Sequence, residues 1–382
     1  MIKSIAIYPD IVDDAYIKKV DDYVKLAGKY HYDEIFTTIH LPEYSLEMQL
    51  EALRIIAKKA KKYHMDIMAD IGGYFIDQLL NNHHPDLPVI DFIRLDYGYS
   101  IEQVSKLYHL LHLKGFVINA STYDHSSFDR LIKQFRNIDD KMEIRCCHNF
   151  YVRKESGLDE LFAYKQDMFI RQYGLPIYYC IPSLNDPRGP LYLGLCTLEK
   201  HRSMELDDII CDLYLNYDMS CFLLSDMWFS EEQLLLIDET LATLTSPLKN
   251  IEEIPVCFEE GISEKEKNIV LGIHQFRYDS PHDLLRSKSS RNMAEFASVI
   301  NANNTIFRKA GTITIDNERY KRYSGELEIV CKDMDSDDRV NVVARIDKKD
   351  IVKLRRFREG ISYKFIQKAI DKSHENNIIE LE

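Results

Sequence analysis

Short runs of β-branched and aromatic residues alternate with stretches of helical periodicity through the first 245 residues, and this alternation limits the possible folds most. The predicted strands cover residues 4–8, 34–40, 65–70, 92–96, 116–121, 143–148, 177–181 and 221–225. Ser100 and Ser230, each followed three residues later by Gln, resemble the capping boxes that begin helices. Eight strand–helix units of about 30 residues predict a closed (β/α)8 TIM barrel. A doubly wound sheet is the alternative, but no G-x-G-x-x-G follows the first strand.

The pattern changes near Pro247, where a polar segment precedes stretches that resemble strands. These stretches cover residues 311–315, 326–331 and 340–346, and residues 376–380 are a candidate last strand. A chain of 382 residues also exceeds what one hydrophobic core usually serves. We therefore predict an α/β protein of two domains: a TIM-barrel catalytic domain at residues 1–246 and a smaller β-rich domain at residues 260–382.

The composition restricts what this protein binds. A net charge of −13 argues against broad binding of nucleic acid, which needs a positive surface. No apolar run reaches the roughly 20 residues that span a bilayer, and the amino-terminus lacks the apolar centre and cleavage site of a signal peptide. The eight cysteines are scattered without a C-x-x-C, so we expect reduced thiols rather than disulfides or a zinc site. These features predict a cytoplasmic protein without a nucleic-acid or membrane partner.

Polar residues gather where the predicted strands end, which is where the catalytic groups of TIM barrels lie. They are Tyr8, His40 with Glu43, Asp70, Asp96, Asn119, His148 with Asn149, Ser183 and Asp226. An Asp in this position is often a helix N-cap, but serines already occupy the caps that follow Asp96 and Asp226. For Asp70, which precedes two glycines, a role in forming a turn is the alternative.

Side chains alternate between the two faces of a strand, so Arg94 shares its face with Asp96. If this face lines the barrel, Arg94 is a buried cation and requires a carboxylate partner. His148 shares its face with Cys146, and we expect it to point into the barrel as well. For a single inward histidine, hydrogen-bonded packing is the alternative to a role in the site.

The loops after the sixth and seventh predicted strands carry further charged residues. The second of these loops is long and contains Arg188, Glu199, His201 and Arg202, a composition that suits an ordered ligand-binding loop. The first loop adds Arg153. Together these cations could hold an anion against the overall negative charge, and exposure to solvent is the alternative for each.

Several segments resemble the motifs of the MupG-type 6-phospho-N-acetylmuramidases, a family formerly described as uncharacterised or "outer surface" proteins. In the first domain they are residues 36–43, 94–98, 119–121, 147–151, 156–158, 188–190 and 197–202. In the second they are residues 286–287, 311–317, 320 and 322–327, which resemble the family's cyclophilin-like domain. The chain departs from the family's usual residues at Val152, Ser156 and Cys196, which leaves open a shifted substrate among phosphorylated disaccharides.

The resemblance implies a TIM barrel followed by a cyclophilin-like domain, and a cytoplasmic glycosidase without a cofactor or metal. The implied substrate is 6-phospho-N-acetylmuramyl-(β1,4)-N-acetylglucosamine, a phosphorylated amino-sugar disaccharide of peptidoglycan recycling. Two other classes remain as alternatives. One is a metal-dependent TIM-barrel sugar isomerase or hydrolase, with Asp70, Asp96, His148 and Asp226 as ligands. The other is a non-catalytic sugar-phosphate-binding protein.

Glycoside hydrolysis usually needs two carboxyl groups, one as general acid and one as nucleophile or base. The catalytic candidates are Asp70 and Asp96, followed by Glu199 and Asp226. The predicted substrate-binding residues are Glu43, Asn119, His148, Asn149, Arg153, Arg188, His201, Arg202 and Arg286. Among them, Arg286 is expected to contact the phosphate from the second domain. The sequence does not indicate which carboxyl group is the acid.

Overall fold

The computed structural model of the chain describes residues 1–81, 87, 89–293, 299–357 and 361–368. The chain divides into two compact units, Met1–Glu239 and Thr240–Glu382. Helix α8 (Glu231–Thr245) crosses this division, and strand β9 (Ile251–Phe258) begins the sheet of the second unit. The predicted domain limits at residues 246 and 260 stay predictions, and proteolysis can test them.

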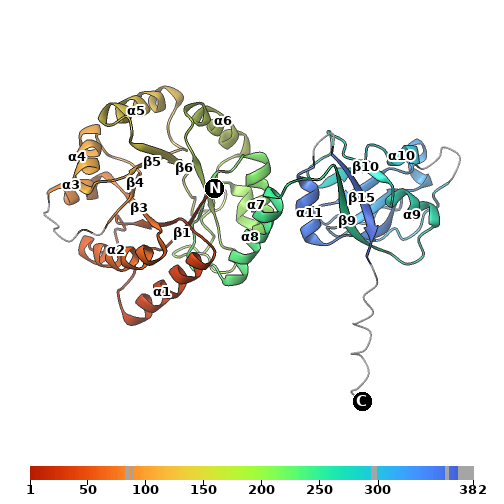
Figure 1. Cartoon of the computed structure of the whole chain (residues 1–382), viewed down its shortest axis with the longest axis horizontal. Coiled ribbons are helices and arrows are strands. Elements are labelled where there is room, and N and C mark those ends of the chain that lie inside the picture. Colours follow the sequence, from red (N-terminus) through yellow and green to blue (C-terminus); the bar gives the residue numbers. More distant parts are fainter. Residues whose placement is uncertain (82–86, 88, 294–298, 358–360, 369–382) are drawn as a thin grey trace, which may run out of the picture. The chain divides into compact units, whose positions relative to one another are not determined.

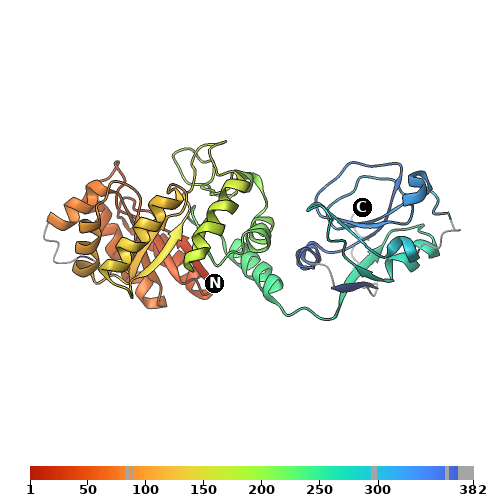
Figure 2. The ribbon, with the colours of Figure 1, turned by 90° about the horizontal axis from the view of Figure 1, so that it is seen from above.

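Eight parallel strands close into a barrel in the first unit, where each strand pairs with the next and β8 pairs with β1. Figure 1 shows the helices around these strands, and Figure 2 shows the same unit turned by 90°. The strands are β1 (Ile2–Ala6), β2 (Glu34–Thr38), β3 (Asp66–Ile71), β4 (Phe92–Leu95), β5 (Gly115–Asn119), β6 (Glu143–Cys147), β7 (Ile177–Ile181) and β8 (Cys221–Leu224). The predicted TIM barrel is confirmed, and each of its strands overlaps a predicted one.

Most helices of the barrel begin at a capping side chain. The other helices are α1 (Asp14–Lys29), α2 (Leu46–Ala60), α3 (Gly73–Asn81), α4 (Ile101–Leu111), α5 (His125–Ile138), α6 (Glu160–Ile170) and α7 (Leu206–Asn216), with 3-10 turns η1 (Lys61–Tyr63), η2 (Arg171–Tyr173) and η3 (Glu199–Ser203). Ser100 and Gln103 form the predicted capping box at α4, and Ser230 and Gln233 exchange the same two hydrogen bonds at α8. Within the described residues, no helix is long and apolar enough to cross a membrane.

The interior of the barrel is apolar at mid-height and polar near both ends. Its buried centre contains Ala6, Phe36, Met68, Phe92, Val117, Cys147, Tyr178, Cys180, Cys221 and Leu223. At the amino-terminal end of the strands, Arg145 donates to Glu34 over 2.8 Å and Tyr178 donates to the same carboxylate over 2.5 Å. Because this buried ion pair lies away from the catalytic end of a TIM barrel, we assign it to stability.

The second unit is a smaller curled sheet of seven strands in the order β10-β15-β9-β14-β12-β13-β11, in which only the β15–β9 pair is parallel within the described residues. Its further strands are β10 (Ile273–Gln275), β11 (Leu284–Arg286), β12 (Thr312–Asp316), β13 (Leu327–Val330), β14 (Val340–Arg345) and β15 (Ser362–Gln367). Its helices are α9 (Glu264–Val270), α10 (Ser290–Met293) and α11 (Lys348–Arg355), with the 3-10 turn η4 (Glu318–Tyr323). Strands β12, β13 and β14 confirm three predicted strands, whereas the candidate strand at residues 376–380 lies outside the described residues.

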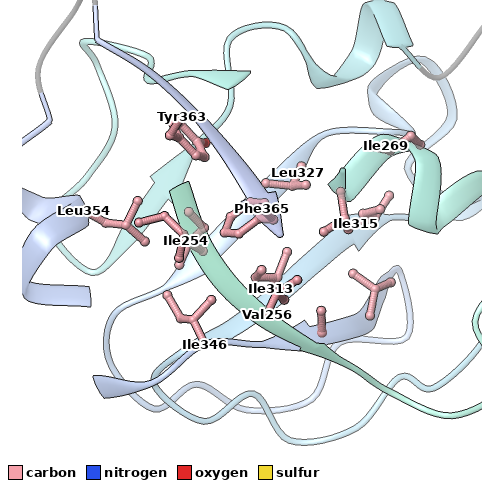
Figure 3. Close-up of a cluster of buried hydrophobic side chains, with 14 of the residues drawn as sticks. Ile254, Val256, Ile269, Ile313, Ile315, Leu327, Ile346, Leu354, Tyr363 and Phe365 are labelled. Atoms are coloured by element: carbon pink, nitrogen blue, oxygen red, sulfur yellow. The ribbon is translucent and has the colours of Figure 1, made fainter. Parts of the chain in front are cut away.

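Alternation along these strands builds the second core. Ile254 and Val256 of β9, Ile313 and Ile315 of β12, and Phe365 of β15 project into one buried cluster (Figure 3). On β12, the two isoleucines alternate with Thr312, Thr314 and Asp316. The opposite face of this strand is therefore polar, although it is also buried.

Candidate active site

The carboxyl ends of β3 and β4 bring two carboxylates onto one arginine. Asp70 and Arg94 are neighbours in the register of these two strands. The Arg94 Nη1 atom lies 2.7 Å from Asp70 Oδ1 and 3.5 Å from Asp96 Oδ1. Burial acts to lower the pKa of Arg94, but the charge of Asp70 and smaller contributions from its neighbours raise it above its ordinary value. The prediction that Arg94 is a buried cation with a carboxylate partner is therefore confirmed.

Two asparagines extend this cluster across β5 and β6. Arg94 Nη2 donates to Asn149 Oδ1 over 2.5 Å, and Asn119 Nδ2 donates to the same oxygen over 2.8 Å. Both guanidinium ends of Arg94 are thereby oriented, and a line of polar groups runs from Asp70 to Asn119 along the barrel mouth. The structure thus brings together Asp70, Asp96, Asn119 and Asn149, four of the predicted site residues.

His40, which follows β2, was a strand-end residue without an assigned role. Its Nδ1 atom lies 3.1 Å from the backbone oxygen of Asp70, and its Nε2 atom lies 3.8 Å from Asp70 Oδ2. His40 therefore borders one of the two catalytic candidates. Glu43, a predicted substrate-binding residue, is exposed on the loop beyond it.

The prediction that His148 points into the barrel is wrong. The inward residues of β6 are Arg145 and Cys147, and Asn149 continues this face. His148 is on the opposite face and fully buried, where its Nε2 atom lies 2.8 Å from Asp167 Oδ1 of α6. Strand alternation was applied correctly, but the wrong set of residues was assigned to the interior, because both faces of this buried strand are largely apolar.

Glu199 and Arg202 fasten the loops after β6 and β7 together. Arg202 donates through Nε and Nη2 to the two carboxylate oxygens of Glu199, over 2.7 and 2.9 Å. Glu199 also accepts from the backbone N–H groups of Glu155 and Gly157. These hydrogen bonds, with those from Arg202 first, lower the pKa of Glu199 to about 2. A Cβ atom on Gly157 would lie 2.6 Å from Glu199, so only glycine fits there.

The remaining donors of Arg202 point at backbone carbonyl groups. They are the oxygens of Tyr151, Arg153, Leu193 and Gly194. With all its nitrogens engaged and only 7% of its side chain exposed, Arg202 acts as a loop clamp in this conformation rather than as an available phosphate ligand.

Asp226 organises the loop after β7 in a similar way. Its carboxylate is fully buried and accepts from the backbone N–H groups of Ser183, Arg188 and Leu195, over 2.7 to 3.1 Å. Burial raises the pKa of Asp226, and the three N–H groups oppose this effect. Both oxygens are thus already bound by the loop that they hold.

The other predicted cations and the histidine of these loops have different surroundings. Arg188 is half-buried, and its guanidinium carbon lies 3.8 Å from the centroid of the Tyr8 ring. Among the described residues, no carboxylate lies within ion-pair distance of Arg188 or of the exposed Arg153. His201 is fully buried, and its Nε2 atom lies 2.7 Å from Asp212 Oδ2 of α7.

Arg286 belongs to an ion-pair cluster of the second unit. Its Nη2 atom lies 2.5 Å from Glu326 Oε1, and Arg277 approaches the same oxygen over 3.2 Å. Beside this cluster, burial and the charge of Glu328 raise the pKa of Asp316 to about 8. The predicted contact of Arg286 with a phosphate stays a prediction.

A metal has no evident place in this arrangement. Within the described ranges, no three His, Cys, Asp or Glu side chains are grouped so that they could hold an ion. The reason is visible at the barrel mouth, where Arg94 lies between the carboxylates of Asp70 and Asp96. The metal-dependent alternative is therefore not favoured by this geometry.

Comparison with known proteins identifies the family. Residues 4–239 match a family described as "6-phospho-N-acetylmuramidase, N-terminal", and residues 253–366 match the corresponding C-terminal family. The chain belongs to the 6-phospho-N-acetylmuramidase family. This name indicates a glycosidase and a phosphorylated muramyl sugar as the substrate class.

Solved structures of similar chains have the same two-part fold. One is described as a conserved protein from a locus in Enterococcus faecalis with an unknown function; it is 26% identical, with 97% of each chain covered and a TM-score of 0.61. Another, an uncharacterized B. cereus protein, is 21% identical, with 96% of this chain and 99% of that chain covered and a TM-score of 0.61. A search among curated proteins gave no match.

Sequence reasoning did not find several residues around the site. Asp167 and Tyr179, which surround His148, lie on a helix and on the outer face of a strand, where nothing in the sequence separates them from ordinary packing residues. Tyr151 was noted only as part of a motif, yet burial raises the pKa of its hydroxyl, and the neighbouring side chains of Ser121 and Asn149 oppose this rise.

Proposed function

We propose that this member of the 6-phospho-N-acetylmuramidase family hydrolyses 6-phospho-N-acetylmuramyl-(β1,4)-N-acetylglucosamine, with Asp70 and Asp96 as its carboxyl pair. The observation that carries the proposal is their shared contact with Arg94 at the catalytic end of the barrel. The family match supplies the substrate class. Cleavage of such a disaccharide would place the protein in cytoplasmic recycling of peptidoglycan sugars.

The geometry suggests a division of roles between the two carboxyl groups. Asp70 forms the short ion pair with Arg94 and is 8% exposed, so its negative charge is balanced, which suits the nucleophile. Asp96 is 26% exposed and lies farther from the same nitrogen, so it can exchange a proton with the leaving group and with solvent. These are the two roles that a retaining glycosidase requires.

The distances also favour one stereochemical outcome. Asp70 Oδ1 and Asp96 Oδ1 lie 2.7 and 3.5 Å from the same Arg94 nitrogen. The distance between these two oxygens is therefore at most the sum of the two values. This limit holds for one oxygen of each carboxyl group, and a separation of this size is consistent with the roughly 5–5.5 Å between the carboxyl groups of retaining glycosidases. We therefore expect the product to keep the anomeric configuration of the substrate, which proton NMR of the first-formed sugar can measure.

The surrounding residues would hold the sugar and its phosphate. Asn119 and Asn149 already orient Arg94, and their remaining polar groups are suited to sugar hydroxyls. Arg188 and Arg153 are the cations suited to the 6-phosphate, because neither has a carboxylate partner among the described residues. Glu199, Arg202 and Asp226 would act indirectly, by fixing the loops that carry these cations.

Turnover by the purified chain tests the proposal. The phosphorylated disaccharide should be split into 6-phospho-N-acetylmuramic acid and N-acetylglucosamine, and a chelator should leave the rate unchanged. Asp70→Asn and Asp96→Asn should each lower kcat by roughly 10²–10⁴-fold, the usual contribution of general acid–base groups. Asp124→Asn is the matched control, since Asp124 caps α5 and Asn caps equally well.

The same experiment separates the alternatives. No turnover by the wild type, together with tight binding of the phosphosugar, would indicate a sugar-phosphate-binding protein. Loss of activity with chelator and its recovery with a divalent ion would indicate the metal-dependent class. Wild-type turnover in both Asn variants would remove Asp70 and Asp96 from the catalytic roles.

A further inference from the structure

A buried chain of hydrogen bonds leads from helix α6 to the barrel mouth through His148. Asp167 Oδ1 lies 2.8 Å from His148 Nε2, and His148 Nδ1 lies 3.0 Å from the Ser121 hydroxyl. Asp167, His148 and Ser121 are at most 9% exposed. The hydroxyl of Ser121 in turn accepts the backbone N–H of Asn149 over 3.0 Å.

The partners at both ends of this chain determine the direction of each hydrogen bond. Tyr179 donates its hydroxyl proton to Asp167 Oδ2 over 2.7 Å, and Arg171 lies 3.6 Å from the same oxygen, so Asp167 is an acceptor. His148 Nε2 must then carry a proton, and in the neutral ring Nδ1 is free to accept. In that neutral ring the Ser121 hydroxyl donates to Nδ1 and keeps its lone pairs for Asn149.

The far end of the chain touches the groups that form the site. Asn149 follows β6 directly, and its side-chain oxygen binds Arg94, which holds Asp70. The Ser121 hydroxyl has two lone pairs, so it accepts the Asn149 N–H while its own proton points at His148 Nδ1. Through these contacts Asp167 and His148 hold the Ser121 side chain, which in turn holds the backbone of Asn149, the residue that orients Arg94.

The order Asp–His–Ser also occurs in hydrolases that use a serine nucleophile. Here the Ser121 oxygen already accepts a backbone N–H, and its residue is only 9% exposed. Both features oppose attack on a substrate carbonyl. The chain is therefore suited to positioning rather than to covalent catalysis.

We propose that Asp167 and His148 are positioning residues, which hold His148 in its Nε2–H tautomer so that Ser121 can fix Asn149 and, through it, Arg94. This role rests on the proposed glycosidase function, because the site that it orders is the one assigned to that reaction. Neither residue touches the substrate. Their loss is expected to affect kcat more than KM.

The tautomer is measured without substrate, by ¹⁵N–¹H NMR of the full chain with ¹⁵N-labelled histidine. His148 should appear as a neutral ring protonated at Nε2, and its signals should be absent in His148→Gln. In Asp167→Asn, Tyr179 still donates to the side-chain oxygen, so the new amide N–H faces His148 Nε2 and should shift the proton to Nδ1. A wild-type His148 ring protonated at Nδ1, or at both nitrogens, would refute the proposed directions of these hydrogen bonds.

Kinetics on the phosphorylated disaccharide give the second readout. Asp167→Asn and Ser121→Ala should each lower kcat by roughly 10–100-fold, the usual effect of partners that orient an active-site group, and change KM far less. Asp159→Asn, which keeps a capping side chain at the start of the same helix, and Ser105→Ala on α4 are the matched controls.

The outcomes separate the two proposals. Inactivity of the wild type on the disaccharide would count against the proposed function. The tautomer of His148 would still test the proposed hydrogen bonds from Asp167 to Ser121. If Asp167→Asn does not fold, Ser121→Ala carries the kinetic test, since it removes one hydroxyl and introduces no new polar group. An unchanged kcat in Ser121→Ala, or equal losses in the control variants, would refute the positioning role and indicate that His148 only contributes to packing.

Discussion

Replacement of Asp316 by Asn should change how the stability of the second unit depends on pH. Asp316 ends β12 and is 6% exposed beside Glu328. Burial, and then the charges of Glu328 and Glu326, raise its pKa from 3.8 to about 8. Asn has nearly the same shape but no charge, so the substitution removes the titration and preserves the packing.

The magnitude follows from proton linkage. Between about pH 5 and 7 the folded chain holds the Asp316 proton and the unfolded chain has lost it, so the free energy of unfolding falls by about 1.4 kcal/mol per pH unit as the pH rises. The decline begins near the unfolded pKa of 3.8 and ends near the folded value of about 8. Between pH 5 and 7 the wild type should therefore lose about 3 kcal/mol that Asp316→Asn keeps.

Hydrogen exchange with mass spectrometry, read from peptides that contain β12 and β13 at pH 5, 6 and 7, can measure this difference after correction for intrinsic rates. Trp228 is the one tryptophan of the chain and lies in the first unit, so its fluorescence is an internal control. Asp337→Asn is the matched variant: Arg339 lowers the pKa of Asp337 to about 2, so it does not titrate in this interval. Parallel pH profiles for the wild type and Asp316→Asn would refute the reasoning.

Three further outcomes are expected. In Arg202→Lys, the lysine cannot bind both oxygens of Glu199 and four backbone carbonyl groups. We expect kcat/KM to fall at least roughly tenfold and proteases to cut residues 153–157 faster, which gel analysis can follow. Arg188→Ala should lower kcat/KM by roughly 10–100-fold for the phosphorylated disaccharide and hardly at all for the unphosphorylated one, and Arg286→Ala in the same assay tests the other predicted phosphate contact. Limited proteolysis should cut between residues 246 and 260 and release a fragment of about 245 residues; cleavage mainly within the first 240 residues would contradict these domain limits.

The barrel could be predicted from the sequence because its signals are local. Each strand is a short apolar run, and Ser100 and Ser230 mark two helix starts without reference to distant residues. The second unit gave weaker signals: β10 and β11 have three residues each, and β15 pairs with β9 from more than 100 residues away. Short strands and distant pairings leave little periodicity to read.

For the site, the sequence indicated the strand ends but not the direction of every side chain. The sequence correctly predicted that Arg94 has a carboxylate partner, because a buried guanidinium needs one, but it did not indicate that this partner is Asp70. His148 was placed on the wrong face, since a strand buried on both sides lacks the alternation that distinguishes its faces. Asp167, its partner on α6, became visible only when the helix was packed against the barrel.

For each arginine at the barrel mouth, its contacts indicate its function more directly than its position in a sequence motif does. Arg94 is held by two carboxylates and an amide oxygen, and Arg202 by Glu199 and four carbonyl groups, so both have their donors committed to the protein. Arg188 faces the Tyr8 ring, which leaves its five N–H donors without a carboxylate in the described part of the chain. In a chain of net charge −13, a half-buried guanidinium in this state gains most from an external anion. We therefore propose Arg188, whose loop Asp226 fixes, rather than Arg202 as the residue that binds the sugar phosphate, two residues that the sequence motifs did not distinguish.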